Sequence, residues 1–390
     1  MRTNLLFSAM AFAALAFAGC SQDDTFSASP AANQLIGFGT YVGRDAVSRA
    51  SVATEESVKQ NHFGVFAYDT KGQEFYTATP TITANTKPDF MDNEEVLWMF
   101  LQEEWDYRPG KYWPNDPNEK LSFFAYSPYN ANVGYTVGAA KNNTLIPFTV
   151  GANIKAQQDL LYAKVVDQTF NNTVDKSGKV KFNFQHALSR ISLAVKCTNL
   201  WLDAKVYIEK VMLTGSGATY DKTSKNWTLS NNVFYTTGDL DLISDVKDKI
   251  DWKNCDGQQS FTWDFSSSPH VVDRTSVSPY DLTGSDGYLM VIPQQFDAQK
   301  LYVCVQYRVE TPRTVTGVND NVISTEKVTD SYYVTTCVNP TGPLEFKYNT
   351  AYRLVLDLKL EWVDCQLGTV NGWPTPSDTE VPQSSAQKQN

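Results

Sequence analysis

Residues 35–42 read LIGFGTYV, and this short stretch alternates in a way that decides the fold class. Ile36, Phe38, Thr40 and Val42 share one side of an extended chain, and the residues between them take the other side. A period of two is typical of a β-strand with one buried face. The stretch therefore predicts a first strand that packs its Ile36 side against a core.

The segment that follows, residues 43–50 (GRDAVSRA), is polar, carries two arginines and opens with glycine. Glycine and short polar residues favour loops, and loops lie on the surface, where proteases reach them. The sequence therefore predicts a first strand that is joined to the body by a cleavable link. A strand that is joined in this way can be removed.

Period-two alternation marks other parts of the chain as well. Val180, Phe182 and Phe184 alternate with polar residues, and the same pattern recurs over residues 190–197 and 352–361. Glycine, proline and asparagine turns separate these short runs. The combination predicts an all-β protein built from two tandem antiparallel β-sandwiches.

The division into domains follows from where the clear strands begin. We place the boundary at Gln185, so that the N-terminal domain covers residues 35–185 and the C-terminal domain residues 186–373. The remainder, residues 374–390, is rich in proline, serine, glutamine and acidic residues, which predicts a disordered tail.

The composition excludes several classes of function. The 390 residues carry 33 Lys+Arg against 43 Asp+Glu, a net charge of −10, so no nucleic-acid partner is expected. The three histidines, His62, His186 and His270, lie at no metal-ligand spacing, and neither a GxSxG nor a phosphate-loop motif occurs. We therefore expect no enzyme, no metal and no cofactor.

The N-terminus has the pattern of an export signal. A basic start and an apolar run over residues 5–17, too short to span a bilayer, lead into Phe17-Ala18-Gly19-Cys20. Small residues before a cysteine resemble a bacterial lipobox, which implies that residues 1–19 are removed and that Cys20 is acylated. The alternative is an ordinary secretory signal with an incidental cysteine.

The residues after Cys20 fit the same interpretation. Residues 20–34 are rich in serine, alanine and aspartate, which predicts a flexible tether between the outer-membrane lipid and the body. Within it, residues 21–24 (SQDD) resemble the export signal of surface-displayed lipoproteins in the Bacteroidetes. This resemblance implies a location on the outer face of the outer membrane.

Two further groups of residues leave alternatives open. If residues 319–321 form a hairpin tip, Cys304 and Cys337 fall nearly opposite each other, as a disulfide or as free buried thiols. Trp105, Tyr112 and Trp113 could stack on sugar rings, or they could fill the core and edge of a β-sandwich.

Several stretches together resemble the Bacteroidales fimbrillin-like family. They occur in family order, and they are WDY (105–107), KYWP (111–114), LSFFAYSP (121–128), DLLYA (159–163), FNFQHALSRI (182–191), GYLMVIPQ (287–294) and YRL (352–354). The resemblance implies two transthyretin-like β-sandwich domains and a role as a subunit of a cell-surface fimbrium. It also makes His186 a core or turn residue of the family and not a metal ligand.

The resemblance also implies a maturation step. In this family an arginine-specific protease cuts the lipoprotein precursor in the link after the first strand, and Arg49-Ala50 is the matching bond here. Arg44-Asp45 is the alternative, but an acidic residue lies beside that bond and the strand is closer.

Loss of the first strand would expose an apolar groove that a strand from another subunit can refill. The candidate donor is the segment with Val363, Cys365 and Leu367, where apolar residues again alternate. The proline-rich tail beyond it suggests a tip or accessory adhesin that contacts a host protein or glycan. The alternative function is a permanently lipid-anchored lipoprotein that binds glycan through its aromatic residues.

Overall fold

The computed structural model describes most of the chain outside its two ends. The described residues are 34–42, 53–78, 81–135, 142–173, 176–198, 203–244, 246–273, 278–284, 287–316, 322–359 and 363–370. The predictions for Cys20, the tether, Arg44, Arg49, Ala50 and the tail lie outside these residues. Within them, no helix is long and apolar enough to cross a membrane.

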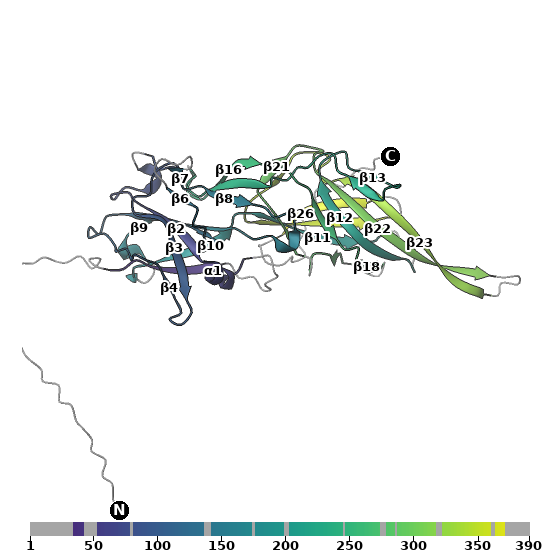
Figure 1. Cartoon of the computed structure of the whole chain (residues 1–390), viewed down its shortest axis with the longest axis horizontal. Helices are drawn as coiled ribbons and strands as arrows, with labels where there is room; N and C mark the ends of the chain where they lie inside the picture. The colour runs from purple at the N-terminus through teal and green to yellow at the C-terminus, as the bar shows by residue number, and fades with distance from the viewer. Residues whose placement is uncertain are drawn as a thin grey trace, which may run out of the picture.

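The protein is all-β, as the alternation predicted, and it is elongated (Figure 1). Its helical segments are α1 (Glu55–Asn61) and the 3₁₀ turns η1 (Phe75–Thr77), η2 (Ile154–Ala156) and η3 (Phe170–Asn172). The N-terminal sheet lies at one end of the long axis, and the strands of the C-terminal half lie at the other (Figure 1).

The N-terminal sheet has the strand order β1-β10-β9-β5-β2-β3-β4. Its strands are β1 (Gly37–Val42), β2 (Phe63–Asp69), β3 (Met91–Met99), β4 (Glu104–Asp106), β5 (Leu121–Ser127), β9 (Leu161–Gln168) and β10 (Lys179–His186). β1 runs parallel to β10, whereas the other neighbours in this sheet are antiparallel. The predicted first strand is therefore part of the sheet, and it occupies the end of the strand order.

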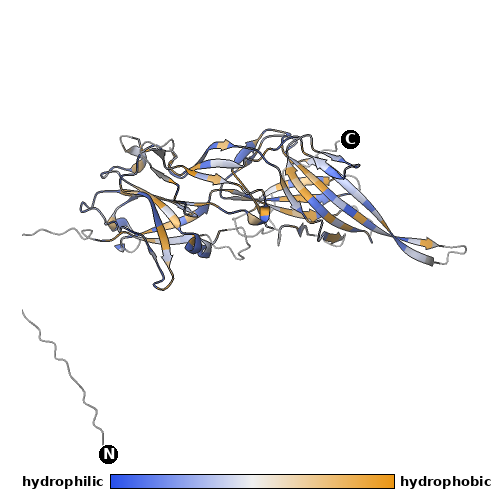
Figure 2. Ribbon diagram, in the orientation of Figure 1, coloured by the Kyte–Doolittle hydropathy of each residue, from blue (hydrophilic) through white to orange (hydrophobic). Residues whose placement is uncertain are grey.

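Two larger sheets face each other in the C-terminal half. One contains β11 (Ser189–Lys196), β19 (Tyr280–Asp281), β20 (Leu289–Val291), β25 (Thr350–Leu358) and β26 (Val363–Val370). The other contains β12 (Lys205–Thr214), β17 (Phe261–Asp264), β18 (His270–Asp273), β22 (Tyr302–Thr316) and β23 (Val322–Cys337). Hydrophobic and hydrophilic residues alternate along β12, β22 and β23 (Figure 2). Because successive side chains of a strand point to opposite faces, this pattern gives the sheet one apolar face that packs against the core.

Short strands complete the fold. They are β6 (Gly134–Tyr135), β7 (Asn142–Asn143), β8 (Ile146–Thr149), β13 (Thr219–Asp221), β14 (Asn226–Thr228), β15 (Thr237–Asp241), β16 (Asp251–Asp256), β21 (Gln294–Phe296) and β24 (Leu344–Phe346). β8 pairs with β15, so strands from both sides of the predicted boundary share one sheet. The boundary at Gln185 stays a prediction.

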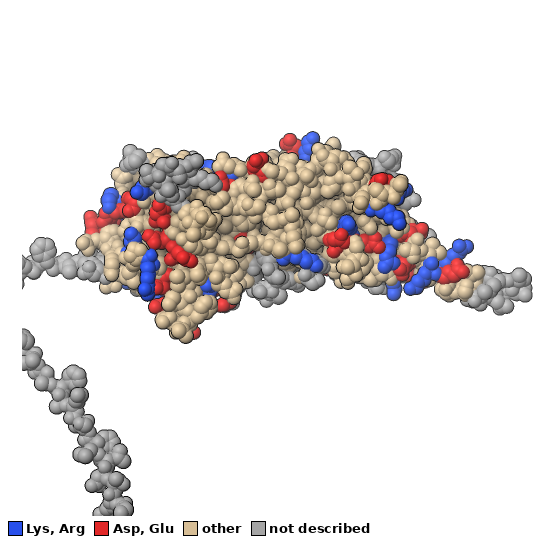
Figure 3. Space-filling view, in the orientation of Figure 1, with Lys and Arg blue, Asp and Glu red and all other residues tan. Residues whose placement is uncertain are grey.

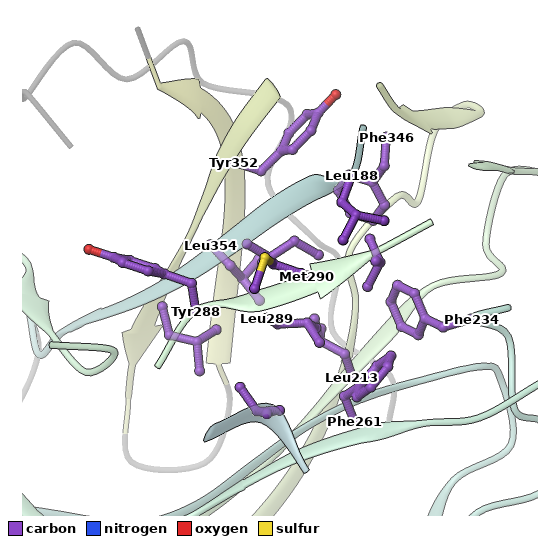
Figure 4. Packing of buried hydrophobic residues seen from close by; sticks show 14 of the residues in the cluster. Leu188, Leu213, Phe234, Phe261, Tyr288, Leu289, Met290, Phe346, Tyr352 and Leu354 are labelled. Atoms are coloured by element: carbon purple, nitrogen blue, oxygen red, sulfur yellow. The ribbon is translucent and has the colours of Figure 1, made fainter. Parts of the chain in front are cut away.

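The buried apolar residues form two main clusters. One fills the N-terminal sheet and includes Phe38 and Val42 of β1 together with Ile36, which directly precedes the strand. The other extends through the C-terminal half, where Leu289 and Met290 of β20 lie between Leu354 of β25 and Phe261 of β17 (Figure 4). Packing of this kind between two sheets is what a β-sandwich requires.

β22 and β23 form a long antiparallel hairpin that extends beyond the body at the far end of the molecule (Figure 1). Its register places Cys304 opposite Thr335 and Cys337 opposite Tyr302, and both cysteines are free thiols. The structure therefore does not contain the Cys304–Cys337 disulfide, and the free-thiol alternative describes it.

Candidate functional site

β1 is held at both of its edges, but in different ways. On one side it pairs with β10 over its whole length, from Gly37 opposite Lys179 to Val42 opposite Phe184. On the other side the backbone contacts come before the strand, where Ile36 N donates to Lys111 O at 2.9 Å. Only one edge of β1 is thus a continuous ladder.

The predicted inner face of β1 is buried in the N-terminal cluster. Ile36, Phe38 and Val42 have 0%, 4% and 6% of their surface exposed, while Thr40 is half-buried. The Phe38 ring lies among aromatic rings, with centroids 5.2 Å from Tyr107 and 5.5 Å from Phe182. Without β1, this part of the core would face water.

Side chains of the body bind the polar groups of β1. The Tyr107 hydroxyl donates to Ile36 O at 2.9 Å, and the Trp105 indole Nε1 donates to Thr40 Oγ1 at 3.1 Å. Burial raises the pKa of Tyr107 to about 12, so its hydroxyl remains a donor above the pH at which an exposed tyrosine ionises. These contacts replace the backbone ladder that β1 lacks on this side.

Glu55 holds the C-terminal end of β1. Its carboxylate accepts hydrogen bonds from the Thr40 hydroxyl and from Val42 N, the latter at 3.1 Å. Glu55 lies in the first turn of α1, where a capping box between Thr54 and Ser57 sets the start of the helix. Val58 is completely buried and fixes the helix against the sheet.

The body resumes after the link at Ala53. Its backbone N–H donates to Asp159 Oδ2 at 3.1 Å, and the same oxygen lies 2.6 Å from His186 Nδ1. Both side chains of this pair are buried, so His186 takes a structural position at the end of β10. Both ends of the link are therefore held by carboxylates, Val42 by Glu55 and Ala53 by Asp159.

An open groove of about 490 Å³ runs along the outer edge of β1. β1 forms one wall, and Glu55, Trp98, Trp105 and Tyr107 form much of the other. Removal of β1 would widen this groove as far as β10.

The aromatic residues proposed for glycan binding do not form a shared platform. Trp113 is only 2% exposed, and its Nε1 donates to Gly178 O at 3.0 Å, so its proposed role in glycan stacking is wrong. Trp105 is half-buried against Phe63 and bonded to Thr40, whereas Tyr112 is 56% exposed. Adjacent residues of an extended segment point to opposite faces, which separates Tyr112 from Trp113.

The candidate donor segment is β26, and it is already paired in its own chain. β26 runs antiparallel to β25 at the end of a strand order, and Val363, Cys365 and Leu367 are 2%, 1% and 5% exposed. Donation to another subunit would require β26 to leave this position.

Sequence reasoning did not identify Glu55 or the contacts of Trp105 and Tyr107 with β1. The Thr54-Glu55-Glu56-Ser57 start of α1 is a local signal for a helix N-terminus, and it could have placed Glu55 beside the link. Among the residues that the structure describes, no cluster of three His, Cys, Asp or Glu could hold a metal ion.

Comparison with known proteins agrees with this architecture. The chain is 26% identical over 393 aligned residues to "Fimbrium subunit Fim1C" of Phocaeicola vulgatus. The alignment covers 95% of this chain and 97% of the relative. The crystal structure of a fimbrial protein from Bacteroides vulgatus has a similar fold, with a TM-score of 0.58 at 24% identity over 87% of this chain and 100% of that one. A family model described as fimbrillin-like matches residues 48–347, and the chain therefore belongs to the fimbrillin-like family.

Proposed function

We propose that this protein is a structural subunit of a cell-surface fimbrium, and that a strand from another subunit replaces β1 during assembly. Membership of the fimbrillin-like family and the similarity to a fimbrium subunit support the role. The position of β1 supports the mechanism. β1 is a peripheral strand with a buried apolar face, and an arginine-bearing link joins it to the body.

Maturation would begin with a lipoprotein that is anchored through acylated Cys20 at the outer membrane. An arginine-specific protease would then cut the link at Arg49-Ala50, with Arg44-Asp45 as the alternative bond. Because Glu55 and Tyr107 still bind β1, the cut strand would stay in place until another strand displaces it.

The vacated groove would bind a new strand strongly. Reburying three side chains at the sites of Ile36, Phe38 and Val42 is worth roughly 5–9 kcal/mol before the entropy cost of association. The edge of β10 would also offer unpaired N–H and C=O groups to the incoming strand. A peptide segment with alternating apolar residues meets both requirements.

We propose β26 as that segment, because it is an outer strand with the same alternation. β26 lies in the half of the molecule away from the N-terminal sheet (Figure 1). Contacts that join one end of a subunit to the other end of the next do not close on themselves, and so they build a filament. Charged side chains gather over the two ends of the molecule, and the face between them is largely uncharged (Figure 3).

A tip or accessory position is the second form of this proposal. β26 is sequestered in its own sheet, and a subunit that keeps it there would accept a strand without donating one. Such a terminal subunit could carry the contact with a host protein or glycan, for which Tyr112 is an exposed aromatic residue.

The N-terminus of the surface protein tests the proposal. Mass spectrometry of shed or fimbrial protein is expected to find Ala50 as the first residue, together with heat-labile ladders on gels. Arg49→Ala is expected to leave the chain tethered and unassembled, while Arg44→Ala is the matched control that should assemble normally. A mature chain that always begins at Cys20 would contradict strand removal.

A further inference from the structure

Thr40 is the one polar residue among the four inward positions of β1. The Trp105 indole donates a hydrogen bond to Thr40 Oγ1 at 3.1 Å, and the Thr40 hydroxyl donates to the Glu55 carboxylate. The same carboxylate also accepts a hydrogen bond from the backbone N–H of Val42. Glu55 and Trp105 belong to the body, so both would remain after β1 has left. We call these two side chains the Thr40 site.

An empty Thr40 site contains one donor and one charged acceptor beside an apolar groove. A hydroxyl side chain satisfies both groups, because it can accept from the indole and donate to the carboxylate. An aliphatic side chain at this position would form neither hydrogen bond, and a hydrogen bond to a charged acceptor contributes more than one between neutral groups.

β26 repeats the pattern of β1 around this position. Residues 36–41 read IGFGTY and residues 365–370 read CQLGTV, so an apolar-Gly-Thr sequence occurs in both strands, although Asn371 follows where β1 has Val42. The burial pattern agrees, since Cys365 and Leu367 are buried as Ile36 and Phe38 are. Thr369, the counterpart of Thr40, is exposed in its own sheet.

On the basis of the proposed function, we propose that the Thr40 site sets the register in which β26 of a second copy binds. Thr369 would bind Glu55 and Trp105, Leu367 would fill the Phe38 position, and Cys365 the Ile36 position. Glu55 and Trp105 are then positioning residues that read a hydroxyl in the incoming strand.

The groove accepts this register without a backbone clash. A side chain at the Gly39 position would meet no atom within 4 Å, and Gly368 takes that position in β26. Gln366 would replace Gly37, where an added Cβ would lie 3.1 Å from the Cγ of Lys179. The Lys179 side chain is exposed and flexible, so it can move aside.

The Thr40 site distinguishes registers of the incoming strand that the alternation of apolar residues does not distinguish. A slip by one residue turns the apolar side chains of a strand away from the core, so alternation already excludes it. A slip by two residues keeps the apolar face inward, but it brings Leu367 to Glu55 and Trp105 in place of a hydroxyl. The loss of these two side-chain hydrogen bonds is expected to disfavour this register about tenfold.

Disulfide trapping between full-length chains, cut in the link by an arginine-specific protease, tests the register. Tyr41 lies opposite Asn183, and both residues are exposed, so Val370 should take that place. We expect Asn183→Cys in one chain to cross-link with Val370→Cys in another about tenfold more than with Gly368→Cys, which reports a two-residue slip.

Substitutions at Thr369 then test the reason for the preference. Thr369→Val should abolish the preference for cross-linking at position 370 over position 368, and Thr369→Ser should retain this preference. Unchanged thermal melts of the uncut variants would exclude a folding defect. Equal cross-linking at positions 370 and 368 in the wild-type background would overturn the register proposal and leave strand donation intact. If β1 stays bound and no position of β26 cross-links, the proposed donation by β26 is itself wrong.

Discussion

The Glu55 carboxylate accepts the backbone N–H of Val42 at 3.1 Å, so the last residue of β1 is bound to the first turn of the helix that follows the link. This contact joins the two sides of the link without using it. Proteolysis of the link alone is therefore expected to leave β1 in place, and its release would be a separate step.

Glu55→Ala is therefore expected to speed the loss of β1 from cut protein. Hydrogen bonds to a charged acceptor are worth about 1.5–3 kcal/mol each, which corresponds to roughly a tenfold or greater increase in the release rate. Native mass spectrometry of the cut chain over time measures the retained fragment. Glu56→Ala is the matched control, because Glu56 is exposed and forms an ion pair with Lys59 on the surface of the helix. Equal release from both variants would contradict a role for Glu55.

Phe38→Ala should destabilise the uncut protein and have no effect on the assembled one. The ring is buried among Phe63, Tyr107, Phe123 and Phe182, so its loss should cost about 3–5 kcal/mol of unfolding free energy. If β1 has left the mature subunit, the thermal stability of the fimbrium should equal that of the wild type. Tyr41→Ala removes a 42% exposed side chain and controls for the change to alanine. A fimbrium that is also weakened by Phe38→Ala would show that β1 is retained.

How much the sequence predicted depends on how local each contact is. The alternation of residues 35–42 predicted the buried face of β1, because period two depends only on neighbouring residues. The same alternation over residues 363–370 predicts a strand that could serve as a donor, but it does not predict that β26 pairs with β25 in its own chain. A local pattern identifies a strand but does not name its partner. The contacts of Glu55 and Trp105 with Thr40 span 15 and 65 residues, and no periodicity reports them.

The five cysteines of the described residues should all react as thiols. Denatured, non-reduced protein is expected to take up iodoacetamide at Cys197, Cys255, Cys304, Cys337 and Cys365. In the native protein only the half-buried Cys255 and Cys337 should react, because burial blocks access to the other three thiols. Burial also raises the pKa of Cys304 to about 11, which lowers its reactivity further. Peptide mapping measures both reactions. A linked Cys304–Cys337 peptide in the non-reduced sample would contradict the structure.

Lys164 should make stability depend on pH above neutrality. Burial lowers its pKa from 10.5 to about 8, although Asp241 and Asp251 partly oppose the shift. Between these pKa values the unfolded chain binds more protons than the folded chain, so stability should rise with pH from about 8 upwards. The buried cysteines, including Cys304, and the buried tyrosines, including Tyr162, have raised pKa values and act in the opposite direction, but only above their ordinary pKa values of 9.0 and 10.0.

Denaturant unfolding at several pH values up to about 8.5 measures this slope, since that range lies below the ordinary pKa values of cysteine and tyrosine. Lys164→Met should flatten it and raise stability at neutral pH, where the folded chain must otherwise hold a buried charge. Lys222→Met changes an exposed lysine in a turn and should leave the slope as it is. A wild-type slope that Lys164→Met does not alter would refute the assignment.

Trp113→Phe separates the structural role of this residue from glycan binding. The indole is buried, and its Nε1 donates to Gly178 O, which also accepts Gly37 N at 3.3 Å. Loss of this hydrogen bond should cost about 1 kcal/mol of unfolding free energy and weaken the start of the β1–β10 ladder. Binding to a glycan array should not change, because the side chain does not reach solvent. Tyr112→Ala is the informative comparison, since it removes a 56% exposed ring that lies next to Trp113 in the chain. If the protein binds glycan, Tyr112→Ala should reduce that binding and leave stability unchanged. A loss of glycan binding that only Trp113→Phe causes would mean that this part of the structure opens in solution.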